Sequence, residues 1–131
     1  MSTSIIRVRD VMQSEVLSID GMASVKAAAA MMRANNTSEL LVNKRNEDDA
    51  WAIVTVMDLV KDVIVPGRDG ENVSVYEIMT KPVITVPATM DIRYAIRLIY
   101  RTGVHRAPVE HMGEIVGMVT LSSLILDSEI V

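Results

Sequence analysis

The stretch "VRDVMQSEVLSI" at residues 8–19 returns in altered form as "VYEIMTKPVITV" at residues 75–86. The two stretches are offset by 67 residues (75 minus 8), and their apolar positions coincide. These positions are Val8 with Val75, Met12 with Met79, and Val16 with Val83. Further along, Thr55 matches Thr120 at an offset of 65, so the intervening loop "NKRNEDDA" makes the first copy two residues longer. Two long copies indicate a tandem duplication rather than a repeat array.

The duplication predicts a first repeat at 8–65, a linker at 66–74 and a second repeat at 75–131, which together form one globular module. The linker contains Pro66, Gly67 and Gly70 in a polar stretch, as turns and connections do. Each repeat begins with a short helical stretch and then follows the order β-α-β-β-α. The predicted strands are the stretches "EVLSI", "ELLVNK" and "AWAIVT" in the first repeat and "PVITV", "RAPVEH" and "EIVGMVT" in the second.

Helix signals flank these strands. Ser24 and Asp91 are good N-caps for helices over 24–35 and 91–102, and two more helices are expected over 56–65 and 121–130. The helix at 91–102 should bury a stripe of Ile92, Ala95, Ile96 and Ile99 and expose Arg93, Arg97 and Arg101. The nearly apolar "VKAAAAMM" should be buried on more than one side, in part against another subunit, and with the final helix "LSSLILDSEIV" it predicts a homodimer. Helices mixed with hairpin-containing sheets predict an α/β (α+β) fold.

Composition excludes several classes of protein. Half of the 131 residues are hydrophobic, so a core can form, and ten of them are Met. The formal net charge of −4 disfavours nucleic acid as a partner, because phosphate backbones need a basic face. The absence of Cys excludes disulfides and thiolate chemistry. Without a long apolar run or a signal peptide, we expect no membrane partner and a cytoplasmic location.

The stretch "TVMDL" at residues 55–59 joins a predicted strand to a predicted helix. Thr55 suits the N-cap, and Asp58 suits the third helical position, where an acid interacts well with the helix dipole. The same arrangement can bind a ligand, since a helix N-terminus attracts phosphate and a carboxylate can accept hydrogen bonds from ribose hydroxyls. Both readings, capping and ligand binding, stay open from the residues alone.

The ordered stretches "IMTKPVITVPATMDIRYAIRLI", "GVHRAPV" and "GMVTLSSLI" resemble a CBS domain, and the first repeat resembles one through "VMQSEVLSIDGMASVKAAAAMM" and "AIVTVMDLV". The chain is therefore identified as similar to a tandem CBS pair, or Bateman module. The resemblance implies two repeats packed about a pseudo-twofold axis. It also implies clefts that hold AMP, ADP, ATP or S-adenosylmethionine, frequent pairing into dimers, and a regulatory rather than catalytic role.

The resemblance also implies which residues bind the ligand. Thr55 and Asp58 would hold ribose and phosphate, and Val83 and Ile84 would flank the adenine. His105 and Arg106 would reach the phosphates, although Arg106 could equally be a solvated strand residue. Ser122 occupies a position where some relatives carry a basic residue. The complete set expected at this cleft is Thr55, Met57, Asp58, Val83, Ile84, His105, Arg106 and Ser122.

The second cleft would differ from the first. The repeat equivalents of Asp58, His105 and Arg106 are Ser123, Ser38 and Glu39, with Thr120 in place of Thr55. A hydroxyl offers no charged bidentate acceptor to ribose, and an added carboxylate repels phosphate. We therefore expect one nucleotide site per chain, and whether the second cleft takes any ligand stays open.

The sequence favours a binding module over an enzyme. The leading hypothesis is a stand-alone sensor that binds an adenosine nucleotide as a regulatory ligand and signals its level to an effector protein. The alternatives are a dimerising or partner-binding scaffold with vestigial clefts, or a sensor of S-adenosylmethionine or NAD. An enzyme is disfavoured, because no nucleophile–base pair is evident. A metal site is also disfavoured, because the hairpin does not give close, same-face spacing to the residues His105, Glu110, His111 and Glu114.

Overall fold

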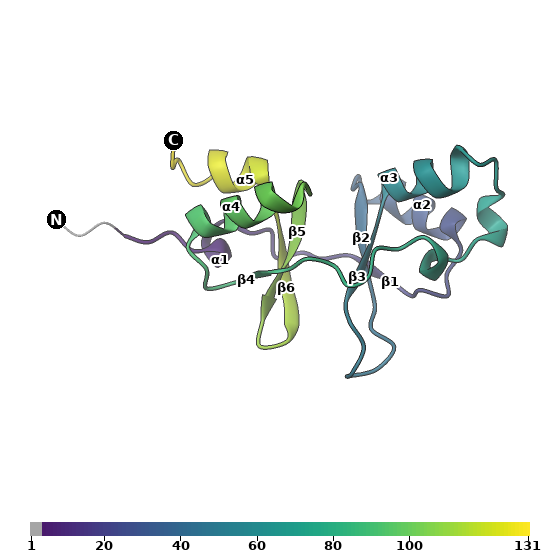
Figure 1. The fold of residues 1–131 in the computed structure, drawn as a ribbon, viewed down its shortest axis with the longest axis horizontal. Coiled ribbons are helices and arrows are strands. Elements are labelled where there is room, and N and C mark those ends of the chain that lie inside the picture. The colour runs from purple at the N-terminus through teal and green to yellow at the C-terminus, as the bar shows by residue number, and fades with distance from the viewer. Residues whose placement is uncertain (1–3) are drawn as a thin grey trace. The chain divides into compact units, whose positions relative to one another are not determined.

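The computed structural model describes residues 4–131 and divides the chain into two compact units. One unit consists of residues 17–83, and the other combines the N-terminal segment up to Val16 with residues 84–131 (Figure 1). Each unit has its own three-stranded sheet and its own hydrophobic core. The predicted mixed α/β class is confirmed.

The unit of residues 17–83 is built on a sheet in the order β1-β2-β3. β1 pairs with β2 in parallel, across the intervening helix α2, and β2 pairs with β3 as an antiparallel hairpin. The helix α3 follows β3 directly and continues as a π-helical turn, η1. The bounds are β1 (Ser18–Ile19), α2 (Val25–Ala34), β2 (Glu39–Val42), β3 (Ala52–Thr55), α3 (Val56–Leu59), η1 (Val60–Ile64), η2 (Gly70–Asn72) and η3 (Val75–Glu77).

The other unit repeats this topology with a sheet in the order β4-β5-β6. β4 and β5 are parallel, and β5 and β6 form an antiparallel hairpin. The helices α4 and α5 lie side by side in this unit (Figure 1). The bounds are α1 (Val8–Val11), β4 (Val86–Pro87), α4 (Ile92–Thr102), β5 (Arg106–His111), β6 (Glu114–Thr120) and α5 (Leu121–Leu126).

The two repeats exchange their first segments. Gln13 of the first repeat and Met118 of the second exchange two backbone hydrogen bonds of 2.9 Å. At the equivalent positions, Thr80 of the second repeat and Ile53 of the first exchange two bonds of 2.8 and 3.0 Å. Each compact unit therefore contains the β-α-β-β-α part of one repeat and the leading segment of the other.

The first strand of each repeat is shorter than the sequence predicts. The expected strands at 15–19 and 82–86 are reduced to Ser18–Ile19 and Val86–Pro87. The reason is that the chain passes from one unit to the other between Val16 and Leu17 and, 67 residues later, between Val83 and Ile84. A segment that leaves one core for another cannot continue in a single sheet. Helices expected at 56–65 and 121–130 also differ, since the first becomes π-helical after Leu59 and the second ends at Leu126.

The helix faces largely follow the sequence pattern. In α4, Ile92, Ala95 and Ile99 are buried and Ile96 is half-buried, while Arg93, Arg97 and Arg101 are exposed, as predicted. In α2, Val25, Ala28 and Met32 are buried, but Ala27 and Ala30 are exposed. The expectation that α2 is buried on more than one side is therefore not met within a single chain.

Candidate functional site

The junction of β3 and α3 carries Thr55 and Asp58 in a reciprocal capping arrangement. The Asp58 backbone N–H donates to Thr55 Oγ1 at 3.2 Å. In return, Asp58 Oδ2 accepts from the Thr55 backbone N–H at 2.8 Å and from Thr55 Oγ1 at 3.1 Å. The capping interpretation of this stretch is therefore correct. Because these bonds engage only Oδ2, the second carboxylate oxygen of Asp58 lies outside the cap. Met57, between the two residues, is 68% exposed.

The start of β2 lies beside this junction. Glu39 is opposite Thr55 in the β2–β3 ladder, so the two side chains share a face of the sheet. Glu39 is 7% exposed, and its Oε2 accepts a hydrogen bond of 2.8 Å from Ser38 Oγ. Residues assigned from sequence to different clefts, Glu39 and Thr55, are thus neighbours within one unit. Only the strand register reveals this proximity.

The junction of β6 and α5 repeats the capping geometry with a hydroxyl in place of the carboxylate. The Ser123 backbone N–H donates to Thr120 Oγ1 at 2.9 Å, and Ser123 Oγ accepts from the Thr120 backbone N–H at 3.1 Å. Ser123 Oγ also donates to the Thr120 carbonyl at 3.0 Å. This hydroxyl uses its one proton within the cap, whereas Asp58 keeps a charged oxygen outside it.

His105, Arg106 and Ser122 come together at the same end of that sheet. Arg106 is the first residue of β5 and pairs with Thr120, and the Leu121 N–H donates to the His105 carbonyl at 3.1 Å. All three side chains are exposed. His105 lies just before the strand, and Arg106 lies at its start, so neither side chain is buried in the core.

Val83 and Ile84 are the consecutive residues at which the chain leaves one unit and enters the other. The Val83 N–H donates to the Trp51 carbonyl at 2.9 Å, which holds Val83 in the unit of residues 17–83. Ile84 belongs to the other unit and is 40% exposed. The eight predicted residues are thus divided equally, with Thr55, Met57, Asp58 and Val83 in one unit and Ile84, His105, Arg106 and Ser122 in the other.

A charged cluster in the β2–β3 loop was missed by the sequence analysis, which treated residues 43–50 only as a polar surface turn. The Asp49 side chain is 7% exposed and lies 2.5 Å from Lys81 Nζ and 3.2 Å from Arg45 Nε. Hydrogen bonds from Lys81, then from the Arg45 backbone and side chain, hold the pKa of Asp49 far below its ordinary value. The charge run in "NKRNEDDA" was the available signal, but the partner Lys81 is distant in sequence.

Over residues 4–131, no three His, Cys, Asp or Glu side chains gather as a metal ion would require. Glu110, one of the discounted candidates, accepts a hydrogen bond of 3.0 Å from Thr85 Oγ1.

Within the same residues, no helix has the length and apolar character needed to cross a membrane.

The sequence matches the CBS domain family over residues 8–64 and again over residues 75–127, and the chain belongs to this family. Its tandem pair of CBS domains defines a regulatory type of module. The chain is 32% identical to an uncharacterized protein of Methanopyrus kandleri, over 78% of this chain and 52% of that protein. It is 30% identical to the mitochondrial CBS domain-containing protein CBSX3 of Arabidopsis thaliana, over 90% of this chain and 62% of that protein. The chain thus spans less than two thirds of the length of these two relatives.

Solved structures agree with this assignment. A hexameric CBS-CP12 protein from bloom-forming cyanobacteria is similar with a TM-score of 0.90 and 31% identity, covering 98% of this chain and 75% of the other. A conserved Pyrococcus horikoshii protein is similar with a TM-score of 0.82 and 28% identity, covering 93% and 91% of the two chains. The predicted family is confirmed.

Proposed function

We propose that this chain is a non-catalytic regulatory module that binds an adenosine nucleotide, AMP, ADP or ATP, and signals its level to a partner protein. Membership of the CBS domain family supports the regulatory role. The observation that carries the ligand assignment is the Asp58 carboxylate, which engages the helix cap through Oδ2 and leaves its other oxygen for a ligand.

Each predicted residue has a chemical role in this proposal. The second Asp58 oxygen accepts hydrogen bonds from ribose hydroxyls, and the start of α3 adds backbone N–H groups. Val83 and Ile84 supply apolar contact and backbone groups for adenine. His105 and Arg106 are exposed donors for phosphate, and Ser122 Oγ is a further one. Met57 is exposed beside Asp58 and supplies a polarizable apolar contact.

Titration calorimetry with AMP tests the proposal. Asp58→Ala is expected to weaken AMP binding by roughly 1.5–3 kcal/mol, the range for a hydrogen bond to a charged group. Asp58→Asn, which keeps an acceptor for the cap, should also weaken binding.

Asp10→Ala is the matched control, because Asp10 Oδ2 accepts from the Arg7 backbone N–H at 2.9 Å in the same kind of cap. It should leave AMP affinity unchanged. Equal AMP affinity of Asp58→Ala and the parent would refute the site.

Self-association is part of the same proposal. A related solved CBS protein is hexameric, and this chain exposes apolar side chains along α3 and η1. These are Val56, Val60 and Ile64, continued by Val65. We infer a homo-oligomer, with a homodimer as its smallest form, in which this face is covered. A cytoplasmic location stays a prediction from the sequence.

A further inference from the structure

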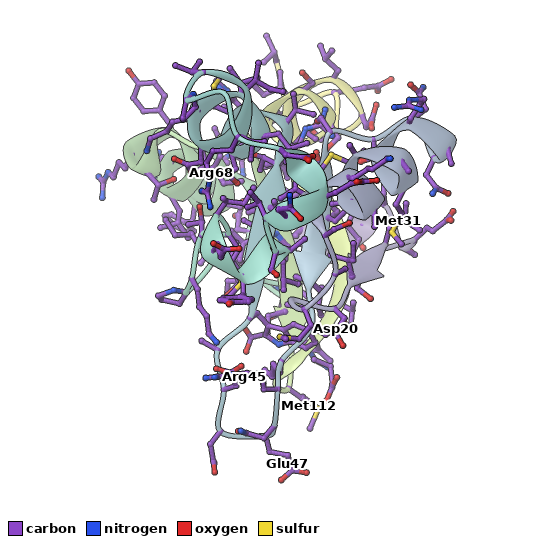
Figure 2. All side chains as sticks on the ribbon, turned by 90° about the vertical axis from the view of Figure 1, so that its right-hand side faces the viewer. Asp20, Met31, Arg45, Glu47, Arg68 and Met112 are labelled. Atoms are coloured by element: carbon purple, nitrogen blue, oxygen red, sulfur yellow. The ribbon has the colours of Figure 1, made fainter. Side chains whose placement is uncertain are left out.

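A cavity of about 630 Å³ lies within the unit of residues 17–83, at the end of the sheet where β2 ends and β3 begins. This is the opposite end of β3 from Thr55 and Asp58. Among residues 4–131, every residue that lines the cavity belongs to this unit, including Asp20 and Arg45, which are labelled in Figure 2. It is therefore distinct from the nucleotide-binding residues proposed above. Its volume falls in the range of small-molecule sites.

The floor of the cavity is apolar. Val42 and Ala52 face each other in the β2–β3 ladder and are 2% and 1% exposed, so they form a fixed surface. Met79, half-buried, Met22, 75% exposed, and Tyr76 line the cavity as well. A ligand with an apolar body would release water from this floor on binding.

The rim of the cavity is cationic. Lys44, Arg45 and Lys81 line it together with two acids, Asp20 and Asp49, which leaves one net positive charge in a chain of net charge −4. Asp49 is already compensated, since it accepts from the Arg45 backbone N–H at 3.0 Å in addition to its two ion pairs. Two cations thus share one carboxylate, and the excess charge favours an anion over a metal cation.

Two donors of the rim, Arg45 and Lys44, contact neighbouring side chains. Asp49 fixes Arg45 through Nε, which leaves the two terminal Nη nitrogens as donors outside that ion pair. Lys44 Nζ lies 5.1 Å from the centre of the Trp51 ring, a cation–π contact that positions the ammonium group. Arg45 lies on the loop between β2 and β3, which also carries Glu47 (Figure 2). Preorganised donors cost less entropy when they bind a ligand.

We propose that this cavity binds a small organic anion with an apolar body, whose charged group is held by Arg45 and Lys44 and whose apolar part lies on Val42, Ala52 and Met79. The ligand class follows from the combination of a cationic rim and an apolar floor. Either part of the ligand alone should bind more weakly than the two joined.

Phenyl phosphate is the probe, because it joins a ring to an anion, and it is titrated into the full-length chain by NMR of backbone amides. The expected result is saturable shifts of amides around the cavity, at Asn43, Ala50 and Tyr76. Inorganic phosphate and benzyl alcohol at the same concentration should shift them less. Asn43 and Ala50 lie at the opposite end of the β2–β3 hairpin from Thr55 and Asp58, so ligand binding at the nucleotide site should shift a different set of amides.

Three variants locate the site. Ala50→Trp should fill the cavity and abolish the shifts, and the combined change Lys44→Gln with Arg45→Gln should weaken binding about tenfold or more. The control Arg33→Gln removes an exposed arginine of the same unit, outside the cavity, and should change nothing. Dispersed amide spectra verify that each variant folds. The proposal is overturned if phenyl phosphate shifts none of these amides, or if Ala50→Trp and the double variant bind it as the parent does.

Discussion

Met12 packs directly onto Gly117 of β6, so closely that a methyl group on Gly117 would lie 2.5 Å from Met12 Sδ and 2.8 Å from the Gln13 carbonyl oxygen. The missing side chain is what lets the leading segment of the first repeat lie against the hairpin of the second. Two backbone hydrogen bonds between Gln13 and Met118 fix the same approach. This segment is therefore an integral part of the unit that contains residues 84–131.

Gly117→Ala should consequently destabilise the protein by about 1–3 kcal/mol, the usual cost of overpacking a well-filled site. The Gln13 carbonyl is backbone and cannot move aside cheaply. Urea unfolding measures the change. Gly70→Ala is the control, because its added methyl would meet its nearest atom at an ordinary 3.6 Å. If Gly117→Ala and Gly70→Ala are equally stable, Met12 does not pack as closely onto Gly117 as described.

One AMP should bind per chain, because the caps of α3 and α5 are chemically unequal. Asp58 keeps a carboxylate oxygen outside its cap, whereas the Ser123 hydroxyl donates its proton to the Thr120 carbonyl. The second site lacks the equivalents of the Asp58 carboxylate and of the cations His105 and Arg106. Loss of two such interactions, of about 1.5 kcal/mol each, would weaken AMP binding there by roughly two orders of magnitude.

Calorimetry should give a stoichiometry near one, and Ser123→Asp alone should not raise it to two. Two equal, tight AMP sites per chain would show that these differences do not disable the second site.

The apolar face of α3 and η1 should drive self-association. Light scattering is expected to give a multiple of the 14.4 kDa chain mass. Ile64 is 69% exposed, and Ile64→Glu should shift the protein toward the monomer, since an interface core excludes an unpaired charge. The control Met112→Glu changes a 90% exposed residue at a hairpin turn and should leave the mass unchanged. A parent protein that is only monomeric at micromolar concentration would contradict the inference.

The Asp49–Lys81 ion pair should make stability depend on pH in a defined direction. Because the folded state lowers the pKa of Asp49, the pair stabilises the protein above the ordinary Asp pKa of about 4, and this contribution is lost as the pH falls below it. Lys81→Gln should therefore be less stable than the parent at pH 7, and the difference should shrink progressively below about pH 4.

Urea unfolding of both proteins at several pH values measures this difference. Lys26→Gln is the control, since Lys26 and Glu71 are 68% and 60% exposed and such pairs contribute little. If the difference in unfolding free energy between the parent and Lys81→Gln stays constant down to pH 2, Asp49 does not have this role.

The sequence by itself determined the duplication, the order of elements, the arginine face of α4 and the cap formed by Thr55 and Asp58. These features depend on residues close in the chain, where periodicity and capping chemistry act directly on the local backbone. The family also followed from the sequence, because its stretches recur in the same order in both repeats.

The tertiary structure alone decided the exchange of leading segments and the ion pair of Asp49 with Lys81. The exchange depends on backbone hydrogen bonds, such as those between Thr80 and Ile53, and backbone groups are the same in every sequence. The Asp49 side chain is 7% exposed, and Lys81, 32 residues further along, supplies the charge that makes this partial burial tolerable. Local sequence patterns cannot identify a partner so far along the chain. The loop at residues 43–50 was therefore predicted to be a solvated turn, whereas in the structure it lines a charged cavity.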